Sequence, residues 1–324
     1  MPMKRVLVTG ASGFIGTALV RRLAADPKVQ VVAGVRSRSR ELDSRECETL
    51  EMGNIEDALL GPRQLQGVYA VVHAAARVHV MQERSSDPLA EFRRVNVEGS
   101  LALARVAAAA GVRRFLFISS IKVNGESSLS GAPFQADSSP APSDPYGVSK
   151  FEAERGLLQL ADETGMEVVI VRPPLVYGPG VRANFLSMMR WLYRGAPLPL
   201  GRIDNRRSLV ALDNLVDLLA LCVEHPAAAN QIFLVSDGED LSTSELLRRL
   251  GLALNRPARL LGWPTPLLYV LLRVLRRDAL VQRLYGSLQV DIEKNRELLA
   301  WVPPVSNQDA LRATAADFLG RGAC

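Results

Sequence analysis

The feature that most constrains the fold is a glycine-rich turn near the N-terminus. The apolar run Arg5–Thr9 leads into Gly10-Ala11-Ser12-Gly13-Phe14-Ile15-Gly16, and a helical pattern follows over Phe14–Ala25. Glycines here permit a tight turn, close approach of the backbone to a ligand, and close packing of helix on strand. The helix N-terminus offers free N–H groups and a positive dipole end. Because the turn stands between a strand and a helix, phosphate binding is favoured over a purely structural role. The predicted contacts are Gly10, Ser12, Gly13, Phe14, Ile15 and Gly16.

The first half of the chain alternates short β-branched runs with helical patterns. The predicted strands are Arg5–Thr9, Gln30–Val35, Ala70–His73, Arg114–Ser119 and Glu167–Arg172. Helices are expected over Phe14–Ala25, Phe92–Ala110 and Pro145–Thr164, and one later strand over Ile232–Val235. This order is typical of α/β proteins built from βαβ units. We therefore expect a doubly wound parallel sheet with a smaller α/β C-terminal substrate lobe.

The composition excludes several other classes of protein. In 324 residues, 48% are hydrophobic and 23% charged, as in ordinary globular proteins. Cys47, Cys222 and Cys324 are scattered without a C-x-x-C pair, which argues against a disulfide framework and a zinc site. The N-terminus enters a strand directly and shows no secretory pattern. We expect a cytoplasmic protein without a bound metal.

Charge and hydropathy argue against nucleic-acid and membrane partners. The net charge is +5, and the basic residues are spread along the chain without an aromatic-rich basic stripe. The most apolar segment, Pro266–Leu275, is about half as long as a bilayer span requires. We expect a packed helix there and no stable membrane insertion, with a membrane-surface contact as the alternative.

Two side chains further along have the spacing of an acid–base pair. Tyr146 and Lys150 stand four residues apart in a predicted helix, so they share one face. The ordinary pKa of a tyrosine is about 10. A nearby ammonium favours the phenolate, so we expect Lys150 to lower the pKa of Tyr146 toward the working range. Ser120 ends a predicted strand 26 residues before Tyr146.

Taken in order, the stretches TGASGFIG, Tyr146-Gly-Val-Ser-Lys150 and RPPLVYGPG resemble the extended short-chain dehydrogenase/reductase family over nearly the whole chain. The resemblance implies a Rossmann-type NAD(P)-binding domain over residues 1–176, which also receives part of 205–240. Residues 177–324 would form most of the substrate lobe. It also implies that Ser120, Tyr146 and Lys150 are catalytic, with Tyr146 and Lys150 also contacting the cofactor, and that the protein forms a homodimer.

The same resemblance assigns further cofactor contacts. Asn54 and Ile55 match the positions that touch adenine, and Ala74, Ala75 and Pro173 match positions near the pyrophosphate or nicotinamide. His73, beside them, is expected to be a packed strand-end residue without a chemical role. Asn96 matches a helix asparagine of mainly structural or water-relaying role.

The choice of nicotinamide cofactor depends on the end of the second predicted strand. Val35-Arg36-Ser37-Arg38 stands where an acidic residue would bind the ribose 2′-hydroxyl, and no acid follows until Glu41. A guanidinium pairs well with a phosphate, so Arg36 favours NADP(H), with NADPH as the reductant. The alternative is that Arg36 only stacks on adenine and that NAD is accepted as well.

Later motifs resemble the sugar-nucleotide branch of the family, with two departures from its pattern. Asn184 and Arg207 fall where relatives bind a diphosphate, Leu200 where they hold uracil, and Arg283 near a second phosphate-binding arginine. Val80 completes the predicted substrate contacts, which point to a UDP-sugar. Ser208 and Ser287 stand where relatives carry aspartate.

The residues after Ser120 bear on the reaction. Dehydratases carry an Asp-Glu pair there, because loss of water needs a separate acid and base. This chain has Ile121-Lys122, which disfavours dehydration, and it continues to Val123-Asn124-Gly125 where epimerases usually have VYG. The strings SSIKVNGE and SDGEDLST resemble bacterial surface-polysaccharide reductases.

We therefore expect reduction by NAD(P)H of the C4 ketone of a UDP-linked 4-keto-6-deoxy-N-acetylhexosamine. The product would be UDP-N-acetylquinovosamine or UDP-N-acetylfucosamine for O-antigen synthesis. The principal alternative is a UDP-hexose 4-epimerase with tightly bound NAD. A cofactor-sensing binding protein and an enzyme for non-sugar ketones are weaker alternatives, because all three predicted catalytic residues and the arginines for a diphosphate are present.

Overall fold

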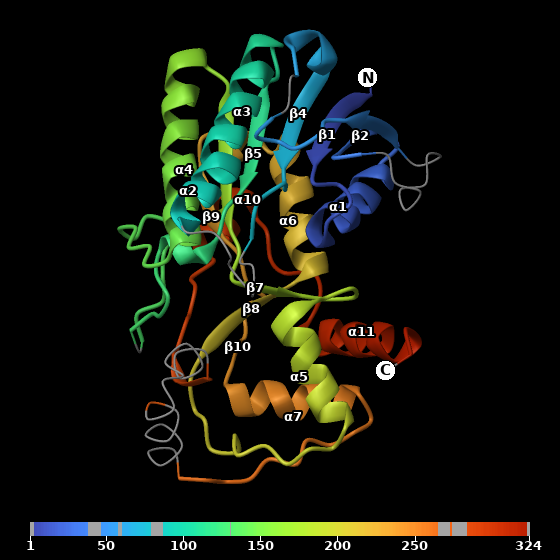
Figure 1. The fold of residues 1–324 in the computed structure, drawn as a ribbon, viewed down its shortest axis with the longest axis vertical. Helices are drawn as coiled ribbons and strands as arrows, with labels where there is room; N and C mark the ends of the chain where they lie inside the picture. Colours follow the sequence, from blue (N-terminus) through green and yellow to red (C-terminus); the bar gives the residue numbers. More distant parts are fainter. Residues whose placement is uncertain are drawn as a thin grey trace.

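The structure, a computed structural model, describes residues 3–37, 47–57, 60–78, 87–129, 131–264, 273 and 284–322. Figure 1 shows a large lobe built on a parallel sheet and, below it, a smaller lobe that contains a second sheet. Neighbouring strands of the large sheet follow the order β3-β2-β1-β4-β5-β6-β9, and all of them pair in parallel. The expected α/β fold with a doubly wound sheet is confirmed.

The predicted strands of this sheet are found with small shifts of their ends. The seven strands are β1 (Lys4–Thr9), β2 (Val29–Val35), β3 (Glu48–Glu51), β4 (Val68–His73), β5 (Arg114–Ile118), β6 (Glu167–Arg172) and β9 (Ile232–Leu234). Strand order reverses between β1 and β4, whose carboxyl ends therefore flank a topological switch point. In open α/β sheets, ligands bind in the crevice at such a point.

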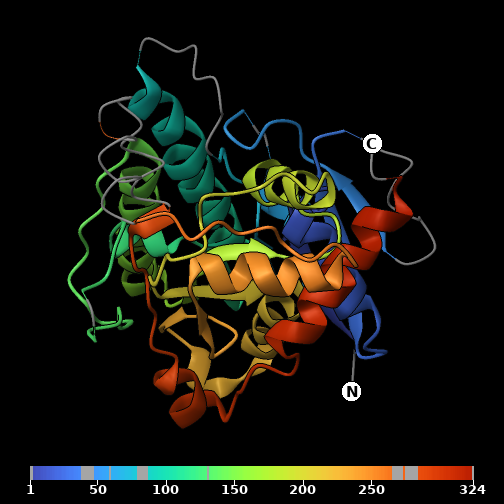
Figure 2. The same ribbon diagram turned by 90° about the horizontal axis from the view of Figure 1, so that it is seen from below.

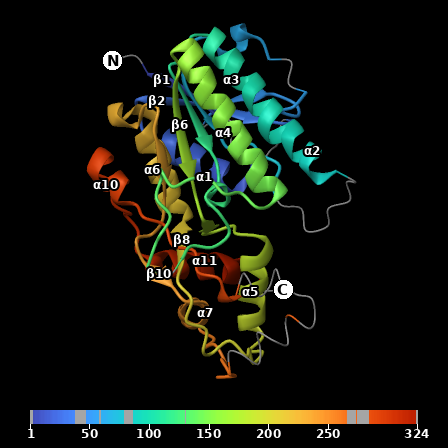
Figure 3. The ribbon, with the colours of Figure 1, turned by 90° about the vertical axis from the view of Figure 1, so that its left-hand side faces the viewer.

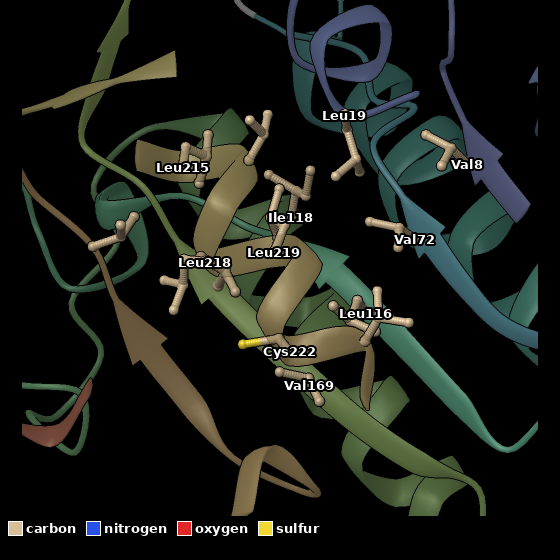
Figure 4. Packing of buried hydrophobic residues seen from close by; sticks show 14 of the residues in the cluster. Val8, Leu19, Val72, Leu116, Ile118, Val169, Leu215, Leu218, Leu219 and Cys222 are labelled. Atoms are coloured by element: carbon tan, nitrogen blue, oxygen red, sulfur yellow. The ribbon is translucent and has the colours of Figure 1, made fainter. Parts of the chain in front are cut away.

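Alternate residues of the strands enter two separate cores, as the two-residue period of a strand requires. On one face, Val8, Val72 and Leu116 pack with helices α1 (Phe14–Ala24) and α6 (Leu212–Glu224). Figure 4 shows Leu215, Leu218, Leu219 and Cys222 of α6 against this face. On the other face, Leu7, Val71 and Phe115 pack with α3 (Ser100–Ala109) and α4 (Pro145–Thr164), so the large lobe has three layers (Figure 3). A strand covered on both faces reads as a nearly continuous apolar run.

The helix predicted over Phe92–Ala110 is not uniform. An α-helix, α2 (Pro88–Arg93), passes into a π-helical turn over Arg94–Gly99 and then into α3. A π-turn widens the helix and re-aims side chains, and it is frequent at functional sites. Gly99 lies in this turn, where a Cβ atom would stand 3.1 Å from Ile55, so the helix approaches the segment after β3 closely.

The small lobe contains strands that the sequence pattern did not predict. Its sheet has the order β10-β8-β7, with β7 (Leu175–Tyr177), β8 (Arg207–Ala211) and β10 (Asp240–Leu241). These strands are only two to five residues long, and β8 pairs with partners about 30 residues away on either side. Among the described residues, this lobe contains the helices α5 (Ala183–Tyr193), α7 (Thr243–Ala253) and α11 (Asn307–Gly320), the last two lying side by side (Figure 2).

Some segments after residue 176 return to the large lobe. Helix α6 packs on α1, β9 joins the large sheet, and α10 (Glu293–Leu299) contacts β9. The described residues also include three short 3-10 turns, at Pro62–Leu65, Ile121–Val123 and Pro226–Ala228. The predicted division into residues 1–176, with part of 205–240, and 177–324 remains a proposal.

Within the described residues, no helix combines the length and the apolar character needed to cross a bilayer. Of the apolar segment Pro266–Leu275, only Arg273 is described. The residues that the structure describes also contain no group of three or more side chains that could bind a metal ion.

Candidate functional site

The glycine turn stands at the switch point that the strand order creates. Gly10 begins the turn that follows β1, and the segment Ala74–Ala76 leaves the neighbouring strand β4. Gly10 has a φ of +64°, and a Cβ atom there would lie 2.8 Å from the backbone nitrogen of Ala75. A Cβ atom on Gly16 would lie 2.0 Å from the carbonyl oxygen of Gly10. Both glycines are therefore required, because the two turns and α1 leave no room for a side chain.

The geometry of this turn fits a dinucleotide. Gly13 is the N-cap of α1, and among the described residues no side chain caps this end and no acidic residue lies in its first turn. The N–H groups of the first turn and the positive end of the helix dipole can therefore receive an anion such as a pyrophosphate. Ser12 and Gly13 are exposed, whereas Phe14 and Ile15 are partly buried.

A buried hydrogen-bond chain holds the two turns together. Thr9 Oγ1 lies 2.7 Å from His73 Nδ1, and His73 Nε2 lies 2.9 Å from Ser100 Oγ. The backbone N–H of Ala75 also donates to Thr9 Oγ1, at 3.2 Å. Burial, with a smaller contribution from the charge of Lys150, lowers the pKa of His73 to about 3. His73 is therefore neutral near pH 7 and links three elements, which accords with the absence of a predicted chemical role.

The predicted adenosine contacts lie at the carboxyl ends of β2 and β3. Arg36 is exposed directly after β2, and its carbonyl oxygen accepts a hydrogen bond from Gly53 N at 3.2 Å. Asn54 is exposed, and Ile55 packs against the π-helical turn at Gly99. All three residues therefore follow the carboxyl ends of these two neighbouring strands.

A groove of about 810 Å³ reaches the glycine turn from the α1–α6 side of the molecule. It is lined by Ser12, Gly13 and Phe14 together with residues of α6 and of the segment near Gly180. Ser120, Tyr146 and Lys150 are not among its lining residues, so this groove does not bring the predicted catalytic side chains together.

The catalytic pair predicted from the sequence meets where β5 and α4 come together. Ser120 follows β5, and its hydroxyl makes a side-chain hydrogen bond with Tyr146, the second residue of α4. The phenol ring also contacts the edge of Phe92 in α2, with the ring centroids 5.9 Å apart. Helix α4 begins here because Asp144 caps it by accepting a hydrogen bond from Gly147 N at 2.6 Å, and Pro145 occupies its first position.

Lys150 is buried one helical turn further on, on the same face of α4. Its ammonium donates to the carbonyl oxygen of Ile118 at 2.8 Å and lies 4.3 Å from the centre of the Phe117 ring. Burial lowers the pKa of Lys150 to about 7, and the charge of Glu154 opposes this shift. A lysine that changes its charge near neutral pH is unusual and is typical of functional sites.

The pKa of Tyr146 does not behave as predicted. Burial and the charge of Asp144 raise it to about 12, and the hydrogen bond with Ser120 only partly opposes them. Lys150 does not lower it, because the Lys150 ammonium is directed toward Ile118 and Phe117. The protein alone therefore holds Tyr146 in its neutral form near pH 7. The positive charge of a bound oxidised nicotinamide would favour the phenolate.

Behind this pair lies a buried ionic network that the sequence interpretation did not identify. Arg172, at the end of β6, donates two hydrogen bonds to Glu154 of α4, at 2.9 and 2.6 Å. Ser119 donates to the same carboxylate, and Arg172 also donates to Asn124 Oδ1 at 3.0 Å. The carboxylate of Glu154 and the guanidinium of Arg172 are thus paired with each other and also form hydrogen bonds with neutral groups. A buried ion pair is tolerated under this condition.

This network explains the departure Val123-Asn124-Gly125. Asn124 is buried, it accepts from Arg172, and its amide donates to the carbonyl oxygen of Gln135 at 3.1 Å. The asparagine therefore stabilises the loop after Ser120. It gives no information about which reaction takes place.

Asn96 connects the π-helical turn to α4. Its amide donates to Ser149 Oγ and to the carbonyl oxygen of Arg77, each at 3.0 Å, and its Oδ1 accepts from Arg77 N at 2.8 Å. Asn96 is fully buried, so in this structure it has a structural role and holds the segment after β4 against the helix of Tyr146.

The predicted substrate contacts lie on separate elements of the small lobe. Asn184 is exposed in the first turn of α5, the carbonyl oxygen of Leu200 accepts a hydrogen bond from Ser244, and Arg207 begins β8 and donates to Gly286. Val80 and Arg283 lie outside the described residues. Pro173 is buried beside Ser120, and its carbonyl oxygen accepts from Ile121 N at 3.0 Å.

Known proteins resemble the chain over nearly its full length. A UDP-glucose 4-epimerase from Vibrio cholerae is 46% identical over 317 residues, which cover 98% of this chain and 96% of the relative. A solved structure of the UDP-glucose 4-epimerase of Thermotoga maritima with UDP-glucose is 25% identical, with a TM-score of 0.78 and coverage of 98% and 99% of the two chains. The NAD complex of UDP-glucuronic acid 4-epimerase from Bacillus cereus shares the fold at 21% identity, with a TM-score of 0.79 and coverage of 98% and 99%.

These similarities overturn the expected reaction. The predicted reduction of a 4-keto sugar is wrong, because the 46% identical relative is an epimerase, and the solved structure above, at 25% identity, is also one. One of the strings that suggested a reductase, SSIKVNGE, contains Asn124, and the structure engages this residue with Arg172 in the loop after Ser120. The alternative, 4-epimerisation, is favoured instead.

Membership of a family is established by a match over most of the chain. The model of the NAD dependent epimerase/dehydratase family matches residues 6–236, which include the glycine turn, Ser120, Tyr146 and Lys150. The chain is thus an enzyme of NAD(P)-dependent oxidoreductase type that acts on a nucleotide sugar. It belongs to the NAD dependent epimerase/dehydratase family, within the extended short-chain dehydrogenases/reductases.

Proposed function

We propose that this protein is a UDP-hexose 4-epimerase that interconverts UDP-glucose and UDP-galactose. The observation that carries the proposal is the 46% identity to a UDP-glucose 4-epimerase across both lobes of the chain. The hydrogen bond between Ser120 and Tyr146 supports it, because epimerisation needs one group that can both accept and return a proton.

The cofactor would lie across the carboxyl ends of the strands. Its pyrophosphate would meet the first turn of α1, its adenosine Asn54 and Ile55, and its nicotinamide the region of Tyr146, Lys150 and Pro173. When bound, it supplies reversible hydride transfer at C4 of the sugar. The relative's structure in complex with NAD supports NAD rather than another type of cofactor.

The chain's own residues move and hold the proton of the C4 hydroxyl. Tyr146 takes this proton as the hydroxyl becomes a ketone and returns it after the sugar has presented its other face. Ser120 donates a hydrogen bond to the same oxygen and fixes its position. Lys150 donates to the carbonyl oxygen of Ile118 and does not lower the pKa of Tyr146, so the positive charge of a bound oxidised nicotinamide would favour the anionic form of the phenol. Oxidation and reduction at C4 cancel, so no cofactor is consumed in the net reaction.

The preference for NADP(H), predicted from Arg36, stays a prediction. An epimerase returns its hydride within one active site, so we propose that the oxidised cofactor stays bound through purification. NAD and NADP are distinguished by denaturing the purified protein and identifying the released nucleotide by chromatography. Release of NADP rather than NAD would support the role predicted for Arg36.

The proposal is tested by adding UDP-galactose to the purified enzyme without any nicotinamide nucleotide. The expected result is UDP-glucose, approaching the same equilibrium ratio from either substrate, as measured by anion-exchange chromatography and NMR. UDP-N-acetylglucosamine in a parallel reaction tests the C2 substituent. The proposal fails if neither UDP-hexose is converted while a 4-keto sugar consumes NAD(P)H stoichiometrically.

Replacing the phenol hydroxyl tests the role of Tyr146. Tyr146→Phe should lower kcat about 1,000-fold, because proton transfer by a positioned side chain contributes about 10²–10⁴. Bound cofactor and thermal stability should be nearly unchanged. Activity close to the unmodified enzyme would remove Tyr146 from the mechanism.

Contacts of Asn184, Leu200 and Arg207 with the UDP group, and the homodimer, also stay predictions. Arg207→Ala should raise KM for the UDP-sugar with a smaller effect on kcat. Light scattering on a sizing column measures the oligomeric state, and a mass near one 35.3 kDa chain would exclude the dimer.

A further inference from the structure

Lys122 lies between Ser120 and Tyr146 in the sequence and has no role in the mechanism above. It belongs to the 3-10 turn Ile121–Val123, two residues after Ser120. Its ammonium forms an ion pair with Asp144 and a second one with Glu126, the latter at 2.9 Å. Burial lowers the pKa of Lys122, but the hydrogen bonds that its ammonium donates to Asp144 and Glu126 raise the pKa overall, so the side chain is charged.

Asp144, the partner of Lys122, precedes Tyr146 by two residues. One carboxylate oxygen, Oδ2, receives the Lys122 ammonium, and the other, Oδ1, caps α4 by accepting from Gly147 N at 2.6 Å. The backbone is also tight here, because a Cβ atom on Gly147 would lie 2.9 Å from the carbonyl oxygen of Lys122. The turn after Ser120 and the first turn of α4 are therefore joined by one ion pair.

The charge of this pair acts on the catalytic phenol. Asp144 is the charged group that raises the pKa of Tyr146, after burial itself. From the other elements around the ring come the Ser120 hydroxyl, Phe92 with the nearby Arg77 cation, and Lys150, whose ammonium is directed to Ile118. An anion near a phenol disfavours the phenolate, and a cation held on that anion offsets its effect.

We propose that Lys122 is a positioning residue, which fixes Asp144 as the cap of α4 and offsets its negative charge beside Tyr146. This inference rests on the proposed function, because it assigns a purpose to a residue that stands beside the site of proton transfer. It also gives a reason for a basic residue two positions after Ser120.

Two single substitutions should move the pH profile in opposite directions. Lys122→Met keeps the length of the stem but leaves Asp144 uncompensated, so the rising limb of kcat should shift up by about 0.5–1 pH unit. Asp144→Asn keeps a good cap but removes the anion, so the limb should shift down. In the double variant the limb should lie well below that of Lys122→Met, because the anion that acts on Tyr146 is removed and only Glu126 loses its partner.

The controls separate electrostatics from folding. Arg93→Met breaks another ion pair on α4, to Glu152 at 2.6 Å, and should leave the limb in place. Lys122→Arg should restore the wild-type limb. If Lys122→Met does not fold, Asp144→Asn alone still decides through the downward shift. Shifts of the same sign in both single variants, or activity losses with an unmoved limb, would overturn the proposal.

A second readout does not depend on epimerase activity. The absorbance of tyrosinate can be titrated in each variant and in the same variant carrying Tyr146→Phe, so that the difference isolates Tyr146. The midpoint of this difference should rise in Lys122→Met and fall in Asp144→Asn. If no UDP-hexose is converted, the proposed function fails, but this titration still tests the role of Lys122.

Discussion

The two lobes use buried polar groups for different purposes. In the large lobe, the buried side chains of Thr9, His73, Ser119 and Arg172 lie at the carboxyl ends of four neighbouring strands, from which the chain continues into the glycine turn and Ser120. In the small lobe, Asp237 gathers hydrogen bonds from Ala211, Asn214, Tyr177 and Asn307, which belong to different segments around the joint of the lobes.

The electrostatics of the two clusters differ as well. Glu154 is matched by the cation Arg172, and both side chains are nearly inaccessible. Asp237 receives its four hydrogen bonds from neutral groups, and burial raises its pKa even though those bonds oppose the shift. We infer that the first cluster holds charges in place for chemistry, whereas the second fixes how the small lobe attaches to the large one.

The largest effect is expected where the backbone itself forms the site. Gly16→Ala places a Cβ atom 2.0 Å from the Gly10 carbonyl oxygen, so the glycine turn must shift. Displacement of a reacting group by about 1 Å can cost about 100-fold in rate, so we expect at least that loss in kcat, together with loss of bound cofactor. The measurements are cofactor content and initial rate.

The matched control lies in the small lobe. Gly320 ends α11 with no atom within 4 Å of a Cβ position, so Gly320→Ala should change neither cofactor content nor rate. Equal losses in the two variants would mean that the glycine turn has no special requirement.

The second effect compares the two polar clusters directly. Glu154→Gln leaves Arg172 buried without its counter-charge and should lower the free energy of unfolding by about 3 kcal/mol. Asp237→Asn keeps an oxygen for Ala211 and Asn214, so its cost should be about 1 kcal/mol. Urea unfolding of both variants measures these changes. A larger cost for Asp237→Asn would reverse the distinction between the clusters.

The smallest effect is a pH dependence in the large lobe. The pKa of His73 is about 3 in the folded protein and about 6.5 in the unfolded chain, so only the unfolded chain binds a proton between these values. This contribution to stability is complete above pH 6.5 and is lost as the pH falls toward 3, by about 2 kcal/mol at pH 5.

Urea unfolding at pH 7.5 and pH 5 measures this loss. His73→Asn removes the titrating ring. Between pH 7.5 and pH 5, the wild type should therefore lose about 2 kcal/mol more of its free energy of unfolding than this variant does. His225→Gln, which leaves the Thr9–His73–Ser100 chain intact, serves as the control. A wild-type and a His73→Asn protein with the same pH dependence would contradict the assignment.

Much of the large lobe was predictable because its signals are local. The glycine turn, the apolar strands and the four-residue spacing of Tyr146 and Lys150 each lie within one short segment. The cap at Asp144 could also have been predicted, since an aspartate followed by proline is typical of a helix start. The π-helical turn at Arg94–Gly99 was not predictable, because it depends on the contacts of Asn96 with Arg77 and Ser149.

The rest depends on contacts between distant parts of the chain. The ion pair of Glu154 and Arg172 forms only when β6 lies beside α4, and β8 is recognisable only once β7 and β10 pair with it. The reaction was predicted wrongly for a related reason. The residues after Ser120 were interpreted as determinants of chemistry, whereas Asn124 is engaged with Arg172 and Lys122 with Asp144.

The central claim is that hydride leaves C4 of the sugar and returns to it within one active site. It is tested most directly with UDP-glucose that carries deuterium at C4, incubated with the purified enzyme in ordinary water and an excess of unlabelled NADH. We expect UDP-galactose that retains the deuterium at C4, with no net change in NADH. Loss of the label from C4, or consumption of NADH in proportion to product, would contradict it.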